Sequence, residues 1–170
     1  MTVEAIETEQ IRRIVAVGAI IMASDGRILV VQETVSKPVI DKQPGDWTFP
    51  AETLEAGETI IEGVRRMITE EVGPLSYSFH TTQDWIGDYG VKGPKGPIWG
   101  RVFLLHAKGS SEDFPGLSSV DGEVINHKWV APRFLQGADR RKGVWEPLKD
   151  FLIGQRGVIC EDCTPGVRGN

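Results

Sequence analysis

The sequence of 170 residues predicts a single α+β domain in which two main helices cover a mixed β-sheet. Three observations lead to this fold class. Two apolar, β-branched runs are separated by Asp25-Gly26, residues 58–72 have a helical apolar pattern, and further strand-like runs precede a last apolar stripe over residues 144–152. A chain of this length can bury a full core, and no internal repeat interrupts it.

The first predicted element is a β-hairpin over residues 13–33. Asp25-Gly26 tolerates the positive φ angles of a tight turn, so the runs on either side are expected to form antiparallel strands. Residues 34–46 contain two prolines and one glycine without periodicity, which predicts a surface loop. Residues 47–50 follow as a short strand that ends at Pro50.

Residues 58–72 predict the most clearly amphipathic helix of the chain. Glu58 and Thr59 suit its first turn, because a carboxylate or hydroxyl there accepts from free backbone N–H groups. Gly73-Pro74 is expected to end it. Its apolar residues gather on one side at 3.6 residues per turn: Ile60, Ile61, Val64, Ile68 and Val72.

The second half of the chain alternates strands and loops before a last helix. Residues 75–87 and 98–109 have strand-like composition and flank a Gly/Pro-rich segment, 88–97, that predicts a loop. Another strand is expected over 122–132, and a helix over 143–155 with Pro147 in its first turn, where the missing N–H costs little. We therefore expect a domain over residues 13–154 between tails 1–12 and 155–170.

The composition restricts the classes of partner. A formal charge of −5, from 19 basic and 24 acidic side chains, gives no reason to expect non-specific binding to nucleic acid or a membrane. No apolar run approaches the roughly 18 residues of a spanning helix, and the first residues lack the basic-then-apolar order of a secretory signal, so we expect a cytoplasmic protein.

Cys160 and Cys163 lie in the expected tail, which excludes a disulfide framework across the fold. We interpret them as solvated thiols, with half a zinc site or a redox pair as the alternatives.

Met67, Glu70 and Glu71 are related as i, i+3 and i+4 and would share one patch of the predicted helix. Two carboxylates near a helix C-terminus repel each other and are disfavoured by the helix dipole. Two explanations stay open from these residues alone. Arg66 pairs with Glu70 on a solvated face, or a divalent cation such as Mg²⁺ bridges the carboxylates.

The longer stretch over residues 47–73 resembles the Nudix box of the Nudix hydrolase family, G-x5-E-x7-R-E-U-x-E-E-x-G-U, where U is aliphatic. The family's usual lead-in matches at Trp47, Phe49, Pro50, Glu55 and Gly57. The likeness extends over residues 13–152 and implies the Nudix fold, an α/β/α sandwich around a mixed sheet. Six residues occupy their box positions in register: Glu58, Arg66, Ile68, Glu70, Glu71 and Gly73.

The resemblance also implies an activity. Family members use Mg²⁺ or Mn²⁺ to hydrolyse a nucleoside diphosphate linked to another moiety, so a small nucleotide derivative is the expected substrate, and homodimer formation stays open. Glu70 and Glu71 would bind the metal, and Arg66 would orient these carboxylates. Residues 122–132 resemble the family's late strand, which would place Glu123 near the metal.

Three box positions depart from the family pattern. Glu52 stands at the first glycine, Pro74 at the last aliphatic position, and Met67 at the glutamate that serves as metal ligand or base. A thioether cannot take a proton, and a hard Mg²⁺ does not select it, so Met67 removes that role. Glu52 is either a replacement metal ligand or a solvated loop residue.

Two functions follow from this sequence. One is a Nudix-type pyrophosphohydrolase with altered catalytic residues, and the other is a catalytically inactive Nudix-like domain that binds a nucleotide or a protein partner. Three aromatic residues leave base stacking, core packing and a partner surface open as roles: Trp85, Tyr89 and Trp99. Three histidines without metal-ligand spacing are interpreted as ordinary strand residues: His80, His106 and His127.

Overall fold

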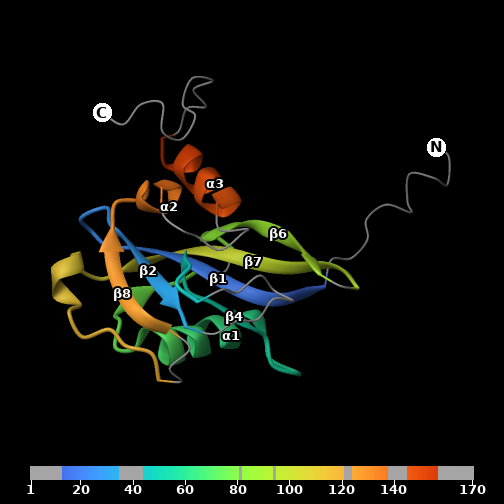
Figure 1. Ribbon diagram of the computed structural model, residues 1–170. Coiled ribbons are helices and arrows are strands. Elements are labelled where there is room, and N and C mark those ends of the chain that lie inside the picture. The colour runs from blue at the N-terminus through green and yellow to red at the C-terminus, as the bar shows by residue number, and fades with distance from the viewer. Residues whose placement is uncertain are drawn as a thin grey trace.

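A computed structural model describes residues 13–34, 44–80, 82–93, 95–120, 124–137 and 145–156. One mixed sheet lies between helices on both of its faces, with α1 (Ile60–Met67) below and α2 (Phe134–Gly137) and α3 (Trp145–Arg156) above in Figure 1. The α/β/α sandwich is confirmed. The tail 1–12, Glu123 and both cysteines lie outside the described residues. Helix α3 continues two residues past the expected end of the domain at 154, and the domain limits stay a prediction.

The expected hairpin forms the start of the sheet. Strand β1 (Ile14–Met22) pairs antiparallel with β2 (Ile28–Glu33), and Gly26 in the turn has a φ of 82°. β1 also pairs in parallel with the long strand β7 (Gly96–Ala107), which makes the sheet mixed. On its other edge, β2 pairs antiparallel with β8 (Val124–Val130), which lies within the expected 122–132.

The sheet opens between β1 and β2 to admit the segment that leads to α1. β3 (Trp47–Thr48) pairs with β2, whereas β4 (Ala51–Thr53) pairs with β1. The single strand expected over residues 47–50 is therefore wrong. Pro50 has no N–H to donate and its carbonyl instead accepts from Ala19, so the chain changes partner strand there. This change places β4 beside the end of α1.

The loop expected over residues 88–97 is also wrong. β6 (Trp85–Gly93) and β7 form a long antiparallel hairpin that extends to the pair Gly93 and Gly96. Gly96, at a φ of 118°, permits the reversal, and pairing with β7 overrides the weak strand propensity of the glycines. The strand expected over 75–87 is divided into β5 (Tyr77–Ser78) and the beginning of β6.

Helix α1 begins with a complete capping box. The Thr59 hydroxyl accepts from the Glu62 amide at 3.2 Å, and the Glu62 carboxylate accepts from the Thr59 amide at 3.1 Å. The α-helical geometry ends at Met67, and one π turn, η3 (Ile68–Val72), follows. The regular helix expected through residue 72 is thus replaced by a wider last turn, in which the Gly73 amide donates to the Ile68 carbonyl at 2.9 Å.

Two apolar clusters hold the layers together. The cluster on the α1 side buries residues of the helix against the sheet, and the cluster on the other side buries residues of α2 and α3. Alternate residues of β1 and β2 contribute to opposite clusters, as the two-residue period of a strand requires. The first cluster includes Val17, Ile21, Leu29, Val64, Met67 and Leu105, and the second includes Ile20, Val30, Val102, Leu135, Leu148 and Phe151.

Replacing Gly73 with alanine is expected to destabilise the fold by about 1 to 3 kcal/mol. Gly73 ends the π turn at φ 90° and ψ −144°, and an added Cβ would lie 3.1 Å from the Ser118 carbonyl oxygen. Urea unfolding of Gly73→Ala measures the loss. Gly116→Ala is the control, because its Cβ would meet no atom within 4 Å. Equal losses in the two variants would contradict this explanation of Gly73.

Candidate active site

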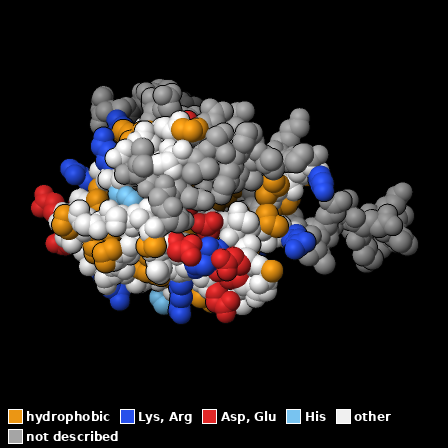
Figure 2. Space-filling model, turned by 60° about the horizontal axis from the view of Figure 1, so that its bottom comes forward, with side chains coloured by type: hydrophobic (Ala, Val, Ile, Leu, Met, Phe, Trp, Pro, Cys, Tyr) orange, Lys and Arg blue, Asp and Glu red, His pale blue; other side chains and the backbone are white. Residues whose placement is uncertain are grey.

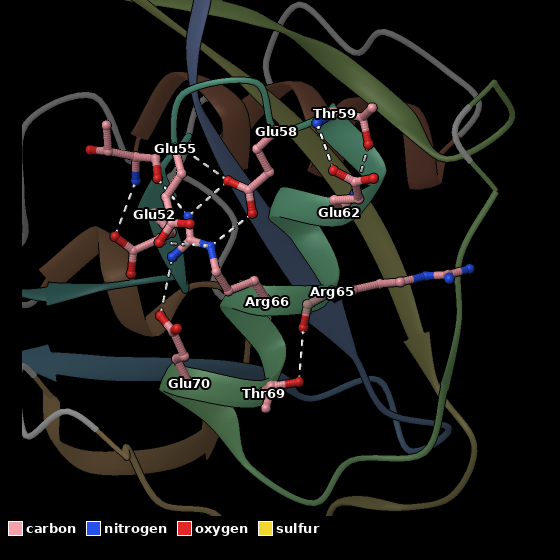
Figure 3. A network of polar contacts seen from close by, with 10 residues as sticks. Glu52, Glu55, Glu58, Thr59, Glu62, Arg65, Arg66, Thr69 and Glu70 are labelled. Atoms are coloured by element: carbon pink, nitrogen blue, oxygen red, sulfur yellow. Dashed lines mark hydrogen bonds and ion pairs between the residues drawn. The ribbon is translucent and has the colours of Figure 1, made fainter.

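Arg66 connects three segments at the base of the molecule. Its Nε and Nη2 donate to the two carboxylate oxygens of Glu58 at 2.8 and 3.0 Å, a bidentate pair. Its Nη1 donates to Glu70 Oε2 at 3.1 Å, and Nη2 also donates to the Thr53 carbonyl at 2.7 Å (Figure 3). The Arg66–Glu70 pair, one of the two explanations that the sequence left open, is present, and the bridging cation stays a prediction. Glu58, which lies before the helix, is the partner that helical periodicity did not predict.

The bidentate pair determines the charge states at the centre of the site. The hydrogen bond from Arg66 is the largest cause that lowers the pKa of Glu58, and the Glu55 amide adds a second donor to the same carboxylate. Glu58 in turn raises the pKa of Arg66. Both groups are therefore ionised throughout the neutral range, and Glu58 acts as a fixed anchor for the guanidinium.

Among the described residues, several carboxylates gather around the guanidinium of Arg66. Glu55 Oε1 lies 3.7 Å from Arg66 Nε, in addition to the carboxylates of Glu58 and Glu70. Figure 2 shows this arrangement as a group of acidic side chains around a basic one on the face that α1 covers. Arg65 points to the opposite side of the helix and leaves Arg66 as the basic partner in this group (Figure 3). A local excess of negative charge favours a bound cation.

The predicted patch of residues 67, 70 and 71 divides into an outward and an inward part. The Glu70 side chain is 37% exposed and faces Arg66, whereas Glu71 is 2% exposed and its Oε2 accepts from the Ala51 amide at 3.2 Å. Met67 is fully buried in the apolar cluster with Val64. Met67 and Glu71 therefore share the side that faces the sheet.

Glu52 belongs to β4 rather than to a loop. It lies opposite Val17 in the register of β4 with β1, and Val17 belongs to the apolar cluster on the α1 side. The Glu52 side chain consequently points to the face that carries Arg66 and Glu70, as Figure 3 shows. Its Oε1 accepts from the neighbouring Thr53 amide at 3.2 Å. A role of Glu52 as metal ligand stays a prediction.

The carboxylates of Glu70 and Glu71 suit a hard divalent cation in their donor chemistry. Mg²⁺ usually binds one or two carboxylates and takes its remaining ligands from water and substrate phosphates. Within the described ranges, no group of three or more acidic, histidine or cysteine side chains is arranged to hold a metal. Glu123, the expected additional ligand, lies outside those ranges. The ligand set is thus still a prediction.

The aromatic candidates Trp85 and Tyr89 face opposite sides of the sheet. Trp85 is 51% exposed, its Nε1 donates to Asp88 at 3.2 Å, and Arg101 lies over its ring. Tyr89 lies on the face of the sheet that α3 covers and donates to Asp150 of α3 at 2.7 Å.

His127, interpreted as an ordinary strand residue, lies in β8, and its Nε2 contacts the backbone carbonyl of Glu71 at 2.5 Å. No spacing rule for metal ligands would find this contact, because it is made to a backbone atom.

Comparison with known proteins identifies the family. A family model described as NUDIX domain matches residues 12–151. The chain belongs to the Nudix family. Phosphatase NudJ of Escherichia coli (strain K12) is 28% identical over 142 residues, which cover 81% of this chain and 83% of NudJ. The chain is therefore similar to a phosphatase over most of its length.

Solved Nudix structures agree with the fold. The MutT protein from Methanosarcina mazei Go1 superposes with a TM-score of 0.64 at 19% identity, covering 85% of this chain and 96% of that protein. The NUDIX domain of Shewanella oneidensis NrtR, complexed with ADP ribose, superposes with a TM-score of 0.60 at 14% identity, covering 93% and 100%. At these identities the likeness concerns the fold alone. Among the described residues, the Nudix chain has no helix long and apolar enough to cross a membrane.

Acid should remove the contribution of Glu58 to stability. Because its pKa in the folded protein lies below the ordinary 4.5, the ion pair stabilises the fold above that pH and is lost as the pH falls through the lowered pKa. Urea midpoints of the unaltered protein and Glu58→Gln should therefore differ at pH 7 and converge as the pH falls below the lowered pKa of Glu58. Glu112→Gln, in the 3-10 turn after β7, is the control and should behave like the unaltered protein. A difference between the two urea midpoints that persists in acid would refute this role of Glu58.

Proposed function

We propose that the protein is a Mg²⁺- or Mn²⁺-dependent Nudix hydrolase that cleaves the pyrophosphate linkage of a nucleoside diphosphate joined to another moiety. The arrangement around Arg66 carries this proposal. Arg66 pairs with Glu58 and Glu70 at 2.8 and 3.1 Å, and Glu71 follows on the same turn. Together with Glu55, the carboxylates around Arg66 outnumber this guanidinium, and a local excess of negative charge favours a bound cation.

The proposed reaction is a hydrolysis at phosphorus. Water attacks one phosphorus of the pyrophosphate, the bridging P–O bond breaks, and the bridging oxygen leaves with the other phosphate, which takes up the released proton. When bound, the cation neutralises phosphate oxygens and lowers the pKa of its water. Glu70 and Glu71 hold the cation, with Glu52 and Glu123 as further ligands, and Arg66 fixes Glu70. ADP ribose, held by the Shewanella oneidensis domain, is a nucleoside diphosphate linked to ribose and supports this class of substrate.

The base in this proposal is a carboxylate other than the one missing at position 67. Met67 is fully buried and offers no proton acceptor. Glu52 and Glu70 are only partly buried and lie on the α1 side of the sheet, where they can contact solvent water. Loss of the usual base lowers a rate by about 10²- to 10⁴-fold, which reduces activity but leaves the contribution of the cation intact.

The burial of Met67 also favours a second candidate function. A methionine that completes the apolar cluster stabilises the fold at a position where catalysis would require a charge. In that case the chain is an inactive Nudix domain that binds a nucleotide or a protein partner. Steady product release by the purified, unaltered protein would eliminate this alternative.

Glu71→Gln should lower kcat/KM by about 100-fold or more if the hydrolase proposal is correct. The amide keeps the size of the side chain and an acceptor for the Ala51 amide, but it is a poorer ligand for a hard cation, and 100-fold corresponds to about 3 kcal/mol. Hydrolysis of a panel of nucleoside diphosphate derivatives with Mg²⁺ or Mn²⁺ measures the effect. Glu112→Gln is the matched control. Absence of turnover above the Glu71→Gln level on the whole panel would reject the proposal.

Met67→Glu should destabilise the metal-free protein by about 2 to 4 kcal/mol, because it buries a second carboxylate beside Glu71. Met67→Leu preserves the apolar volume and should cost less than about 1.5 kcal/mol. Addition of Mn²⁺ should raise the thermal unfolding temperature of Met67→Glu more than that of the unaltered protein or Met67→Leu, because the added carboxylate is a further ligand for the cation. A Met67→Glu variant that is as stable as Met67→Leu without metal would contradict the buried placement of this side chain.

A further inference from the structure

The last carbonyls of the π turn accept hydrogen bonds from a segment distant in sequence. A helix end leaves its final carbonyl groups without partners inside the helix. Here the Glu70 carbonyl accepts from the Val120 amide at 2.7 Å, and the Val72 carbonyl accepts from the Ser118 amide at 3.1 Å. Two of three successive carbonyls are thus satisfied by backbone amides of the stretch that precedes β8.

The carbonyl between them has a side chain as its partner. His127 Nε2 lies 2.5 Å from the Glu71 carbonyl oxygen, and an imidazole N–H is the donor such a contact requires. His127 pairs with Val31 in the register of β8 with β2. The strand therefore supplies a rigid base from which the ring reaches the π turn.

Glu71 is consequently held at both of its ends. Its backbone carbonyl contacts His127 of β8, and its carboxylate accepts from the Ala51 amide of β4 at 3.2 Å. These two strands lie on different sides of the opening between β1 and β2. Because its backbone carbonyl and its carboxylate both have partners on strands of the sheet, the Glu71 side chain has little freedom to change direction.

Gly73 allows the stretch before β8 to approach this closely. Its missing side chain leaves room for the Ser118 backbone, which an added Cβ would meet at 3.1 Å. A Cβ at this position would force the Ser118 backbone to move by a few tenths of an ångström. The backbone contacts and the imidazole contact thus belong to one arrangement.

We propose that His127 is a positioning residue of the active site, whose ring N–H fixes the backbone of Glu71 and thereby directs the Glu71 carboxylate. In this role the ring acts through the backbone carbonyl that it holds. The consequence for cation binding rests on the proposed function. The consequence for the Glu71 carboxylate concerns the metal-free protein and does not depend on it.

The Ala51 amide provides a direct test in the metal-free protein, because it donates to the Glu71 carboxylate. In His127→Ala, hydrogen exchange at the Ala51 amide should accelerate by about tenfold or more, as Glu71 loses its fixed direction. The Gly63 amide, which donates to Thr59 at the start of α1, should exchange at an unchanged rate. His127→Gln keeps an N–H donor and should restore the slow exchange at Ala51.

His106→Ala is the matched control, since His106 is an exposed histidine of β7. Its Ala51 amide should exchange as in the unaltered protein. An Ala51 amide that exchanges equally slowly in His127→Ala would overturn the proposal. Acceleration in His127→Ala without rescue by His127→Gln would also overturn it, because the effect would then come from lost packing rather than from the lost donor.

Titration with Mn²⁺, followed by the electron paramagnetic resonance of the free ion, separates this proposal from the proposed function. The dissociation constant for Mn²⁺ should rise about threefold or more in His127→Ala. It should return to the value of the unaltered protein in His127→Gln and should stay at that value in His106→Ala. If Mn²⁺ fails to bind the unaltered protein, the metal-dependent function is wrong, while the Ala51 amide still decides the role of His127. If Mn²⁺ binds His127→Ala as tightly as the unaltered protein, the positioning role is rejected.

Discussion

The guanidinium of Arg66 is the group on which the geometry of this site depends. It binds a carboxylate before the helix, a backbone carbonyl at the end of β4 and a carboxylate of the π turn. These segments belong to different parts of the fold and carry a surplus of negative charge. A planar group with five N–H donors can satisfy several acceptors at once, whereas lysine would offer a point charge without the bidentate geometry. The same contacts that stabilise the fold therefore arrange the acidic side chains.

Burial separates neighbouring residues of the helix into different physical roles. Glu70 faces solvent beside a cation, Glu71 is inside the protein with a backbone donor, and Met67 lies in the apolar cluster. At position 67 the apolar contacts of a methionine take the place of the carboxylate that the family pattern has there. The protein therefore combines two carboxylates at the helix end with a neighbouring core residue that contributes stability. This combination explains why hydrolysis with altered residues and ligand binding without turnover are both consistent with the Nudix fold.

Local patterns predicted the elements whose signals lie within a few residues. The Asp25-Gly26 hairpin, the helix that begins after Thr59, and the helix with Pro147 in its first turn were all found in this way. The errors arose where pairing at long range decided the outcome. Glycines and prolines predicted a loop after Asp88, but pairing with β7 makes most of it a strand, and Pro50 changes the strand partner inside a segment expected to be continuous.

The sequence by itself determined the family and the spacing of the box, because Glu58, Arg66, Glu70 and Glu71 occupy their positions in register. The tertiary structure decided what each of them faces. The pairing of β4 with β1 turns Glu52 to the α1 side, and β8 brings His127 to the carbonyl of Glu71. Spacing along a helix fixes only an angle about its axis. The neighbour found at that angle depends on strands that are distant in the chain, and no local pattern contains that information.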